Sequence, residues 1–240
     1  MGDVMRVETS GASEQTARQD RLTERGVAAS RRMAQTDFSK VQKYRGLIED
    51  VAREKNVQAA VIAGIMSRES RAGAALKDGW GDHGNAFGLM QVDKRYHTVE
   101  GEWNSKKHIS QTTGILKDMI TNIQRKFPNW TTEQQLKGGI AAYNCGPGKV
   151  SSYETVDSRT TGHDYSNDVV ARAQWYNEHC ALGAEYANSD DTAGAVAVPL
   201  VRMMLSLMTL TWCCCNALGA DDAVPVKAVP WLRIRRMQSP

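Results

Sequence analysis

Cysteine is scarce over most of this 240-residue chain, so no disulfide framework is predicted there. The first cysteine is Cys145, the next is Cys180, and the other three stand together near the C-terminus. No Cys-x-x-Cys pair and no Cys/His grouping with the spacing of zinc ligands is present. The region before Cys145 therefore does not depend on disulfides, which fits a reducing compartment.

The N-terminus, MGDVMRVETSGASEQTARQDRLTERG, lacks the apolar run of a classical signal peptide. We therefore expect a protein that is cytoplasmic or is released to the extracellular space by a non-classical route.

A strong excess of charge of one sign is also missing from the sequence. The net charge of +3 is too small to indicate nucleic-acid binding, although it suits approach to an anionic polymer such as a bacterial wall. The five histidines have no ligand spacing, so no metal or organic cofactor is expected.

Composition divides the chain into three regions. Residues 1–36 are polar and predict an extended N-terminal arm, residues 37–185 predict the main domain, and residues 186–240 form an apolar tail of unknown status. Within the tail, residues 203–220 are uncharged and at the lower edge of transmembrane length. Pro199 and Arg202 weaken that interpretation, so membrane contact is held as an alternative to a non-native or disordered tail.

Helical spacing of apolar residues dominates the main domain. Asp37 is placed to cap a first helix that continues to Val51, and an apolar helix from about 57 to 70 is expected at the centre of the core. Further helices are predicted around residues 115–127, from Thr131 with a Thr/Gln capping box, and around 167–180.

Between residues 71 and 103 the chain is rich in Gly, Asp and Asn and shows no helical period. It predicts loops and one or two short strands, of which 89–92 is the best candidate. The fold class is therefore α+β, mostly helical, with a small irregular β element between helices.

Glu69 is the first candidate for chemistry, because it lies at the C-terminal end of the apolar helix. Partial burial and the negative end of a helix dipole both disfavour a charged carboxylate, so we expect a raised pKa there. A raised pKa suits a general acid at neutral pH. The alternative is an ordinary ion pair with Arg68 or Arg71.

Two more acids, Asp82 and Asp93, lie in the Gly-rich segment. Either alone would be read as a turn residue. Together with an acid on a rigid helix, they provide the pairing of an inverting glycosidase, in which one carboxyl protonates the leaving oxygen and another activates water. In AYNCGPG, Tyr143 and Asn144 end a helix, where a ring and an amide can line a sugar cleft or simply stop the helix.

Six stretches in order, over about residues 6 to 182, resemble goose-type lysozyme. They are TSGAS (9–13), GVAAS (26–30), VIAGIMSRESRAG (61–73), GWGDHGNAFGLMQVDKR (79–95), FPNWTTEQQLKGGIAAYN (127–144) and DYSNDVVARAQWY (164–176). The resemblance implies a lysozyme-like fold for the main domain. It also implies a muramidase that cuts the β-1,4 bond between N-acetylmuramic acid and N-acetylglucosamine of peptidoglycan with inversion, and a role in antibacterial defence.

The resemblance also implies roles for individual residues. Glu69 matches the family's general acid, and Asp82 and Asp93 match the acids that hold or activate water, with the division between them open. The positions that match substrate-contacting or acid-shaping residues of the cleft are Gln91, His97, Tyr143, Asn144 and Tyr165. A monomer is expected.

The chain departs from avian members, in which two disulfides are expected in the N-terminal region. Glu14 and Arg25 stand at the comparable positions here, so those bridges cannot form. Among family members it resembles most the fish proteins, which likewise lack the bridges and a signal peptide.

Two other functions compete with the hydrolase. A lytic transglycosylase shares the Glu-Ser, GLMQ and AYN elements, but it needs only the acid, because the muramyl C6 hydroxyl replaces water. A non-catalytic peptidoglycan-binding protein is the second, and the presence of all three acids argues against it.

Overall fold

The computed structural model describes residues 1–180, and the predicted tail at 186–240, with its 203–220 stretch, lies outside these. The α-helices of this part are α1 Glu14–Gln19, α2 Gly26–Gln42, α3 Arg45–Lys55, α4 Ala59–Ser70, α5 Lys106–Lys126, α6 Thr132–Cys145 and α7 Tyr165–Cys180. Short 3-10 turns are η1 Val4–Arg6, η2 Asp82–Gly84, η3 Pro147–Lys149 and η4 Thr161–His163. The strands are β1 Trp80–Gly81, β2 Ala86–Phe87 and β3 Val92–Asp93. The predicted α+β, mostly helical class is confirmed.

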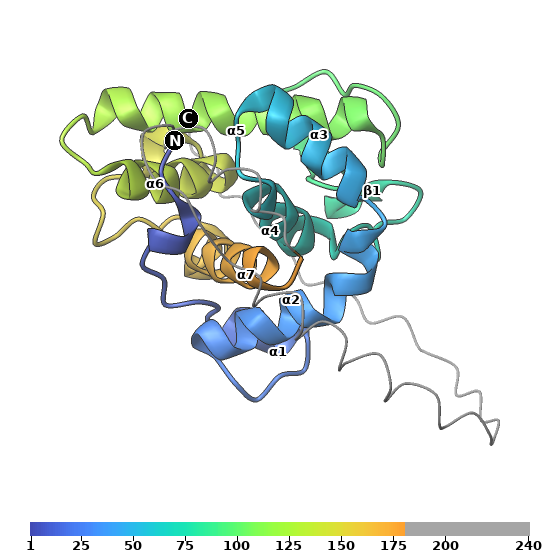
Figure 1. Cartoon of the computed structure of the whole chain (residues 1–240), viewed down its shortest axis with the longest axis horizontal. Helices are drawn as coiled ribbons and strands as arrows, with labels where there is room; N and C mark the ends of the chain where they lie inside the picture. The colour runs from blue at the N-terminus through green and yellow to red at the C-terminus, as the bar shows by residue number, and fades with distance from the viewer. Residues whose placement is uncertain (181–240) are drawn as a thin grey trace, which may run out of the picture. The chain divides into compact units, whose positions relative to one another are not determined.

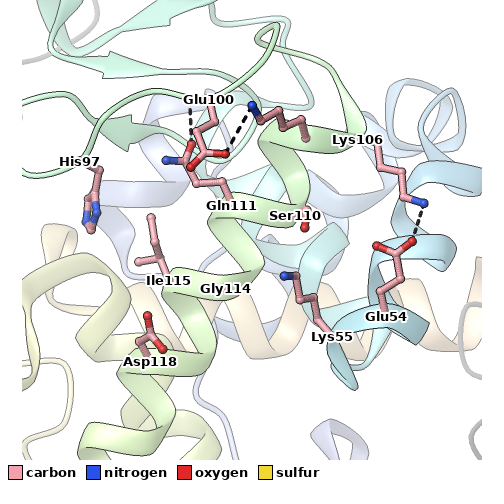
Figure 2. Close-up of a pocket in the computed structure, with 11 residues that line it drawn as sticks. Glu54, Lys55, His97, Glu100, Lys106, Ser110, Gln111, Gly114, Ile115 and Asp118 are labelled. Atoms are coloured by element: carbon pink, nitrogen blue, oxygen red, sulfur yellow. Dashed lines mark hydrogen bonds and ion pairs between the residues drawn. The ribbon is translucent and has the colours of Figure 1, made fainter.

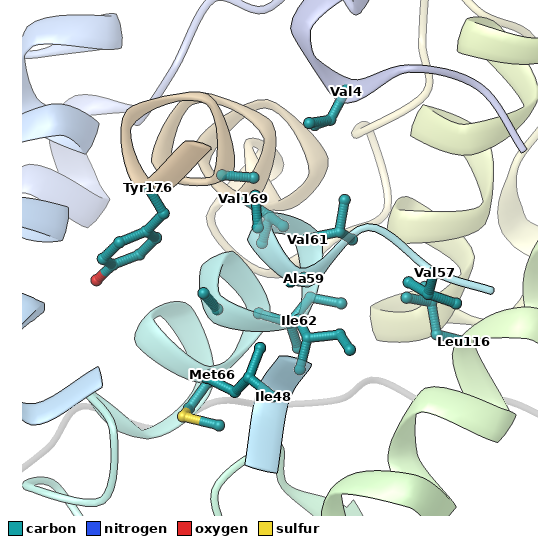
Figure 3. Packing of buried hydrophobic residues seen from close by; sticks show 14 of the residues in the cluster. Val4, Ile48, Val57, Ala59, Val61, Ile62, Met66, Leu116, Val169 and Tyr176 are labelled. Atoms are coloured by element: carbon teal, nitrogen blue, oxygen red, sulfur yellow. The ribbon is translucent and has the colours of Figure 1, made fainter. Parts of the chain in front are cut away.

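Helix α4 is the centre of the core, as its uniformly apolar sequence predicts. Ten of its twelve residues are buried, and α2, α3 and α7 contact it (Figure 1). Figure 3 shows Ile62 and Met66 of α4 among apolar side chains from neighbouring elements, including Ile48. The helix ends at Ser70, because Arg71 adopts a left-handed conformation with φ 54°.

Gly64 sets how closely α4 approaches α7. A Cβ atom at this position would lie 2.8 Å from the carbonyl oxygen of Val169 and 3.1 Å from the Cβ of Ala173. No side chain larger than hydrogen fits between the two backbones, so this glycine determines the spacing of the two helices that carry Glu69 and Tyr165.

The small β element is a three-stranded antiparallel sheet in the order β1-β2-β3. Trp80 pairs with Phe87, and Ala86 pairs with Asp93. The strand predicted at 89–92 is wrong, since only residue 92 of that range belongs to a strand. The preceding residues form a turn whose backbone groups bond to other parts of the chain instead of to a neighbouring strand.

The N-terminal region differs from the expected extended arm. Asp37 does not cap a helix: it lies inside α2, fully buried, and the expected boundary at residue 36 falls within that helix. Buried positions recur four residues apart at Ala29, Met33, Asp37 and Val41, a stripe that the polar composition of the region conceals. Further upstream, Val4 belongs to the main core.

The other helix predictions are confirmed. Thr131 and Gln134 form the capping box at the start of α6, with both reciprocal hydrogen bonds present. Helix α7 begins at Tyr165, two residues before the predicted start, and α6 ends at Cys145, just after Tyr143 and Asn144. None of the helices within residues 1–180 is both long and apolar enough to cross a membrane.

Two glycine-to-alanine changes test this packing. Gly64→Ala should lower the free energy of unfolding by about 2 kcal/mol, because the added methyl group forces α4 and α7 apart. Gly114→Ala, in the middle of α5 where a Cβ meets nothing within 4 Å, should raise it by about 0.5–1 kcal/mol through helix propensity. Urea unfolding of both variants measures the difference. Equal stability of Gly64→Ala and the wild type would contradict the close approach.

Candidate active site

Glu69 occupies the last turn of α4, and its carboxylate is held by a tyrosine. The hydroxyl of Tyr165, the first residue of α7, donates a 2.6 Å hydrogen bond to Glu69 Oε1. Tyr165 is buried, and burial followed by the nearby Glu69 carboxylate raises its pKa well above 10. The phenol therefore stays protonated and donates around neutral pH, whereas Glu69 as a residue is only partly buried.

The arginines on either side of Glu69 are engaged by aspartates. Arg68 Nη1 lies 2.6 Å from Asp168 Oδ2, and its Nη2 lies 3.0 Å from Asp164 Oδ1. Burial alone would lower the pKa of Arg68, but Asp168 and Asp164 hold it above its usual value. Arg71 pairs with Asp37 and Asp20. Both arginines that the sequence offered as ion-pair partners of Glu69 are thus paired with aspartates.

The turn between β2 and β3 is fixed next to Glu69. The hydroxyl of Ser70, the residue after Glu69, donates to the carbonyl of Leu89 at 2.7 Å. The Met90 carbonyl accepts the Tyr143 hydroxyl at 2.8 Å, and the Met90 N–H donates to His108 Nε2 at 3.3 Å. The sheet that carries Asp93 is thus attached to α4, α5 and α6 at one short turn.

His108 can accept the Met90 N–H only while its ring is neutral. The ring is fully buried, and this burial lowers the pKa of His108 to about 4. A neutral imidazole with an accepting Nε2 is therefore the form present around neutral pH. His108 was not predicted as a site residue, and its isolated position in the sequence gives no signal of this contact.

Asp82 and Asp93 are brought together around Arg95. Asp93 is 7% exposed and accepts two side-chain hydrogen bonds from Arg95, 2.9 Å from Nε and 2.6 Å from Nη2. The same Nη2 lies 3.9 Å from Asp82 Oδ2. Sequence reasoning missed Arg95, because a cation two residues after an acid is ordinary on a surface. Here it neutralises part of the charge that two neighbouring carboxylates would otherwise concentrate.

Of the remaining predicted cleft residues, two are hydrogen-bonded to the backbone and one is exposed. Gln91, with φ 57°, donates from Nε2 to the Gly88 carbonyl at 2.9 Å and so braces its own turn. Asn144 Oδ1 accepts the Thr161 N–H at 2.9 Å, which fixes the loop ahead of α7. His97 is exposed and lines an open cavity over α5 (Figure 2).

Metal ligands are not clustered in the part of the chain that the structure describes: no group of three His, Cys, Asp or Glu side chains there could hold an ion. A carboxyl on a rigid helix, a carboxylate on strand β3 and another on the turn η2 can serve as acid and base, the groups that a glycoside hydrolase requires.

Comparison with known proteins agrees with that class. The family model "Lysozyme g" matches residues 1–180. The relatives include the lysozyme G of Dromaius novaehollandiae, 59% identical over 74% of this chain and 87% of its own length. The lysozyme g of Casuarius casuarius is 58% identical over 74% and 96%, and that of the fish Cyprinus carpio is 55% identical over 73% and 95%.

The chain belongs to the lysozyme g family, and it is thereby a glycoside hydrolase of the lysozyme class. The resemblance seen in the sequence is confirmed. The family match also begins at residue 1, so it includes the N-terminal region as well as the main domain.

Tyr165→Phe tests the hydrogen bond to Glu69. Losing the donor favours the protonated carboxyl, so we expect the alkaline limb of the kcat/KM profile to move to higher pH. Activity at the optimum should fall about tenfold, because the acid also loses its orientation. Tyr176→Phe is the matched control, since it removes a buried hydroxyl of the same helix that bonds the Ala34 carbonyl at 3.0 Å. Identical pH profiles for the two variants would contradict the assigned role.

Proposed function

We propose that this chain hydrolyses the β-1,4 bond between N-acetylmuramic acid and N-acetylglucosamine in peptidoglycan, with inversion at the anomeric carbon. The environment of Glu69 is the main support for this proposal. A buried tyrosine hydroxyl donates a hydrogen bond to its carboxylate, and both neighbouring arginines are paired with aspartates. A protonated Glu69 would donate its proton to the glycosidic oxygen as that bond breaks.

The water-activating role falls to Asp82 and Asp93. Water would approach the sugar from the face opposite the departing oxygen, and one of these carboxylates would take its proton as the new C–O bond forms. At the end Glu69 is deprotonated and the aspartate is protonated, and the aspartate loses its proton to solvent while Glu69 regains one from solvent. The configuration at the anomeric carbon is inverted because a single displacement occurs.

The contacts of Arg95 support a shared role for the two aspartates. Its guanidinium holds Asp93 closely and Asp82 more loosely, at 2.6 Å and 3.9 Å from the same nitrogen. If one carboxylate is lost, the other keeps this partner and its place beside the substrate water. Neither aspartate is therefore expected to be irreplaceable on its own.

Analysis of the reaction products tests the proposal against a lytic transglycosylase. NMR of the early products should show the α-anomer at the new reducing end, and mass spectrometry should show hydrated muramyl ends. Muropeptides with 1,6-anhydro ends would overturn hydrolysis, and an initial β-anomer would overturn inversion.

Substitution of the three acids tests their roles. Glu69→Gln should lower kcat by at least about 10²-fold, because the amide cannot supply the proton. Asp82→Asn and Asp93→Asn should each retain partial activity that exceeds that of Glu69→Gln. The exposed Glu24 provides the control, Glu24→Gln, which should lyse cell walls like the wild type.

Three outcomes would contradict these assignments. Equal lysis by Glu69→Gln and the wild type would remove Glu69 as the acid. A wild type that binds peptidoglycan without cleaving it would favour the non-catalytic binding protein. The shared role of the aspartates would be disproved if Asp82→Asn or Asp93→Asn alone abolished activity as fully as Glu69→Gln does.

We propose further that the protein is a monomer used in antibacterial defence, in the cytoplasm or after release by a non-classical route. The mild net charge and the scarcity of cysteine before Cys145 support this setting. Light scattering after size exclusion should give the mass of one chain, 26.5 kDa. Cell fractionation locates the protein.

A further inference from the structure

A cavity of about 790 Å³ lies over α5, outside the set of side chains that holds Glu69. We call it the α5 basin; six of its lining residues are Glu54, Lys55, His97, Lys106, Gly114 and Ile115. Figure 2 shows His97 on one side of α5 and Glu54, Lys55 and Lys106 toward the other. The α5 basin therefore extends from a residue assigned to the sugar cleft across the helix to the end of α3.

Gly114 lines the α5 basin and is not explained by packing within residues 1–180. It lies in the middle of a 21-residue helix, where glycine is less favourable than alanine. A Cβ atom there would meet nothing within 4 Å, in contrast to the close approach at Gly64. A bare backbone facing open space is useful where a ligand lies directly on the helix.

The charges of the α5 basin indicate what kind of ligand this is. Its lining carries both signs and no Trp, Tyr or Phe, whereas sites for neutral sugar rings usually offer an aromatic face. Lys106 lies 2.5 Å from Glu54, with the two side chains 42% and 51% exposed. Ion pairs this exposed contribute little stability, so their members can change partners when a charged ligand arrives. Lys55 has no ion pair within the described residues.

We propose that the α5 basin binds the peptide stem of peptidoglycan, the short peptide attached to the lactyl group of N-acetylmuramic acid. This inference rests on the proposed function. A stem carries carboxylates and an amine on a flexible backbone, which matches ammonium groups at Lys55 and Lys106 and a carboxylate at Glu54. A sugar strand beside His97 would direct its stem across Gly114.

Paired substrates test the α5 basin: soluble glycan strands with intact stems, and the same strands stripped of stems by an amidase. For Lys55→Gln and Gly114→Gln, the ratio of kcat/KM on intact strands to that on stripped strands should fall about fivefold. Lys117→Gln, an exposed lysine of α5 outside the α5 basin, should keep the wild-type ratio. Gly114→Gln should not lower the melting temperature, because glutamine is a better helix former than glycine.

A second measurement separates this inference from the catalytic proposal. Calorimetry with a free stem tetrapeptide should detect binding to the wild type and at least fivefold weaker binding to Lys55→Gln. An unchanged substrate ratio in both variants, or equal losses on both substrates, would overturn the assignment. A wild type that cleaves neither substrate yet binds the tetrapeptide through Lys55 would defeat the proposed function and leave the α5 basin assignment standing.

Discussion

The buried ion pair between Arg68 and Asp168 is the interaction on which the site depends most. Arg68 directly precedes Glu69 on α4, and Asp168 lies one turn after Tyr165 on α7. Both charges are buried, and burial raises the pKa of Asp168 while Arg172 and Arg68 bring it down to about 2. Removing either partner would leave the other buried charge with one counter-ion fewer, since Arg68 would keep only Asp164 and Asp168 would keep only Arg172. The pair therefore fixes the rotation of α4 against α7, and with it the meeting of Glu69 and Tyr165.

The spacing of the same two helices is set by Gly64, which allows backbone contact one turn before the ion pair. Packing thus determines the distance between α4 and α7, and electrostatics determines their register. A hydrogen bond of 2.6 Å between side chains from two helices requires both. This explains why the hydroxyl of Tyr165 reaches one particular oxygen of Glu69 even though the two residues are far apart in sequence.

The helices, and the position of Glu69 at the end of α4, could be predicted from the sequence because their signals are local. The apolar run of α4 and the capping box at Thr131 need no knowledge of the remainder of the fold. The turn at Leu89 could not be predicted, because its carbonyl bonds to a serine of another element. Arg95 was missed for a related reason: it contacts both Asp82 and Asp93, and only the folded sheet brings these two acids together.

The N-terminal region shows how the fold holds without the disulfides expected in avian members. Glu14, at one of the comparable positions, begins α1. The N–H of Ser13 donates to Asp164 at 2.6 Å, and the hydroxyl of Ser30 donates to Asp168 at 2.7 Å. These are the two aspartates that hold Arg68. Hydrogen bonds from the arm therefore help to satisfy the carboxylates on which the position of Glu69 depends. Detaching the N-terminal region would weaken the buried ion pairs, so the docking of this region and the orientation of Glu69 depend on each other.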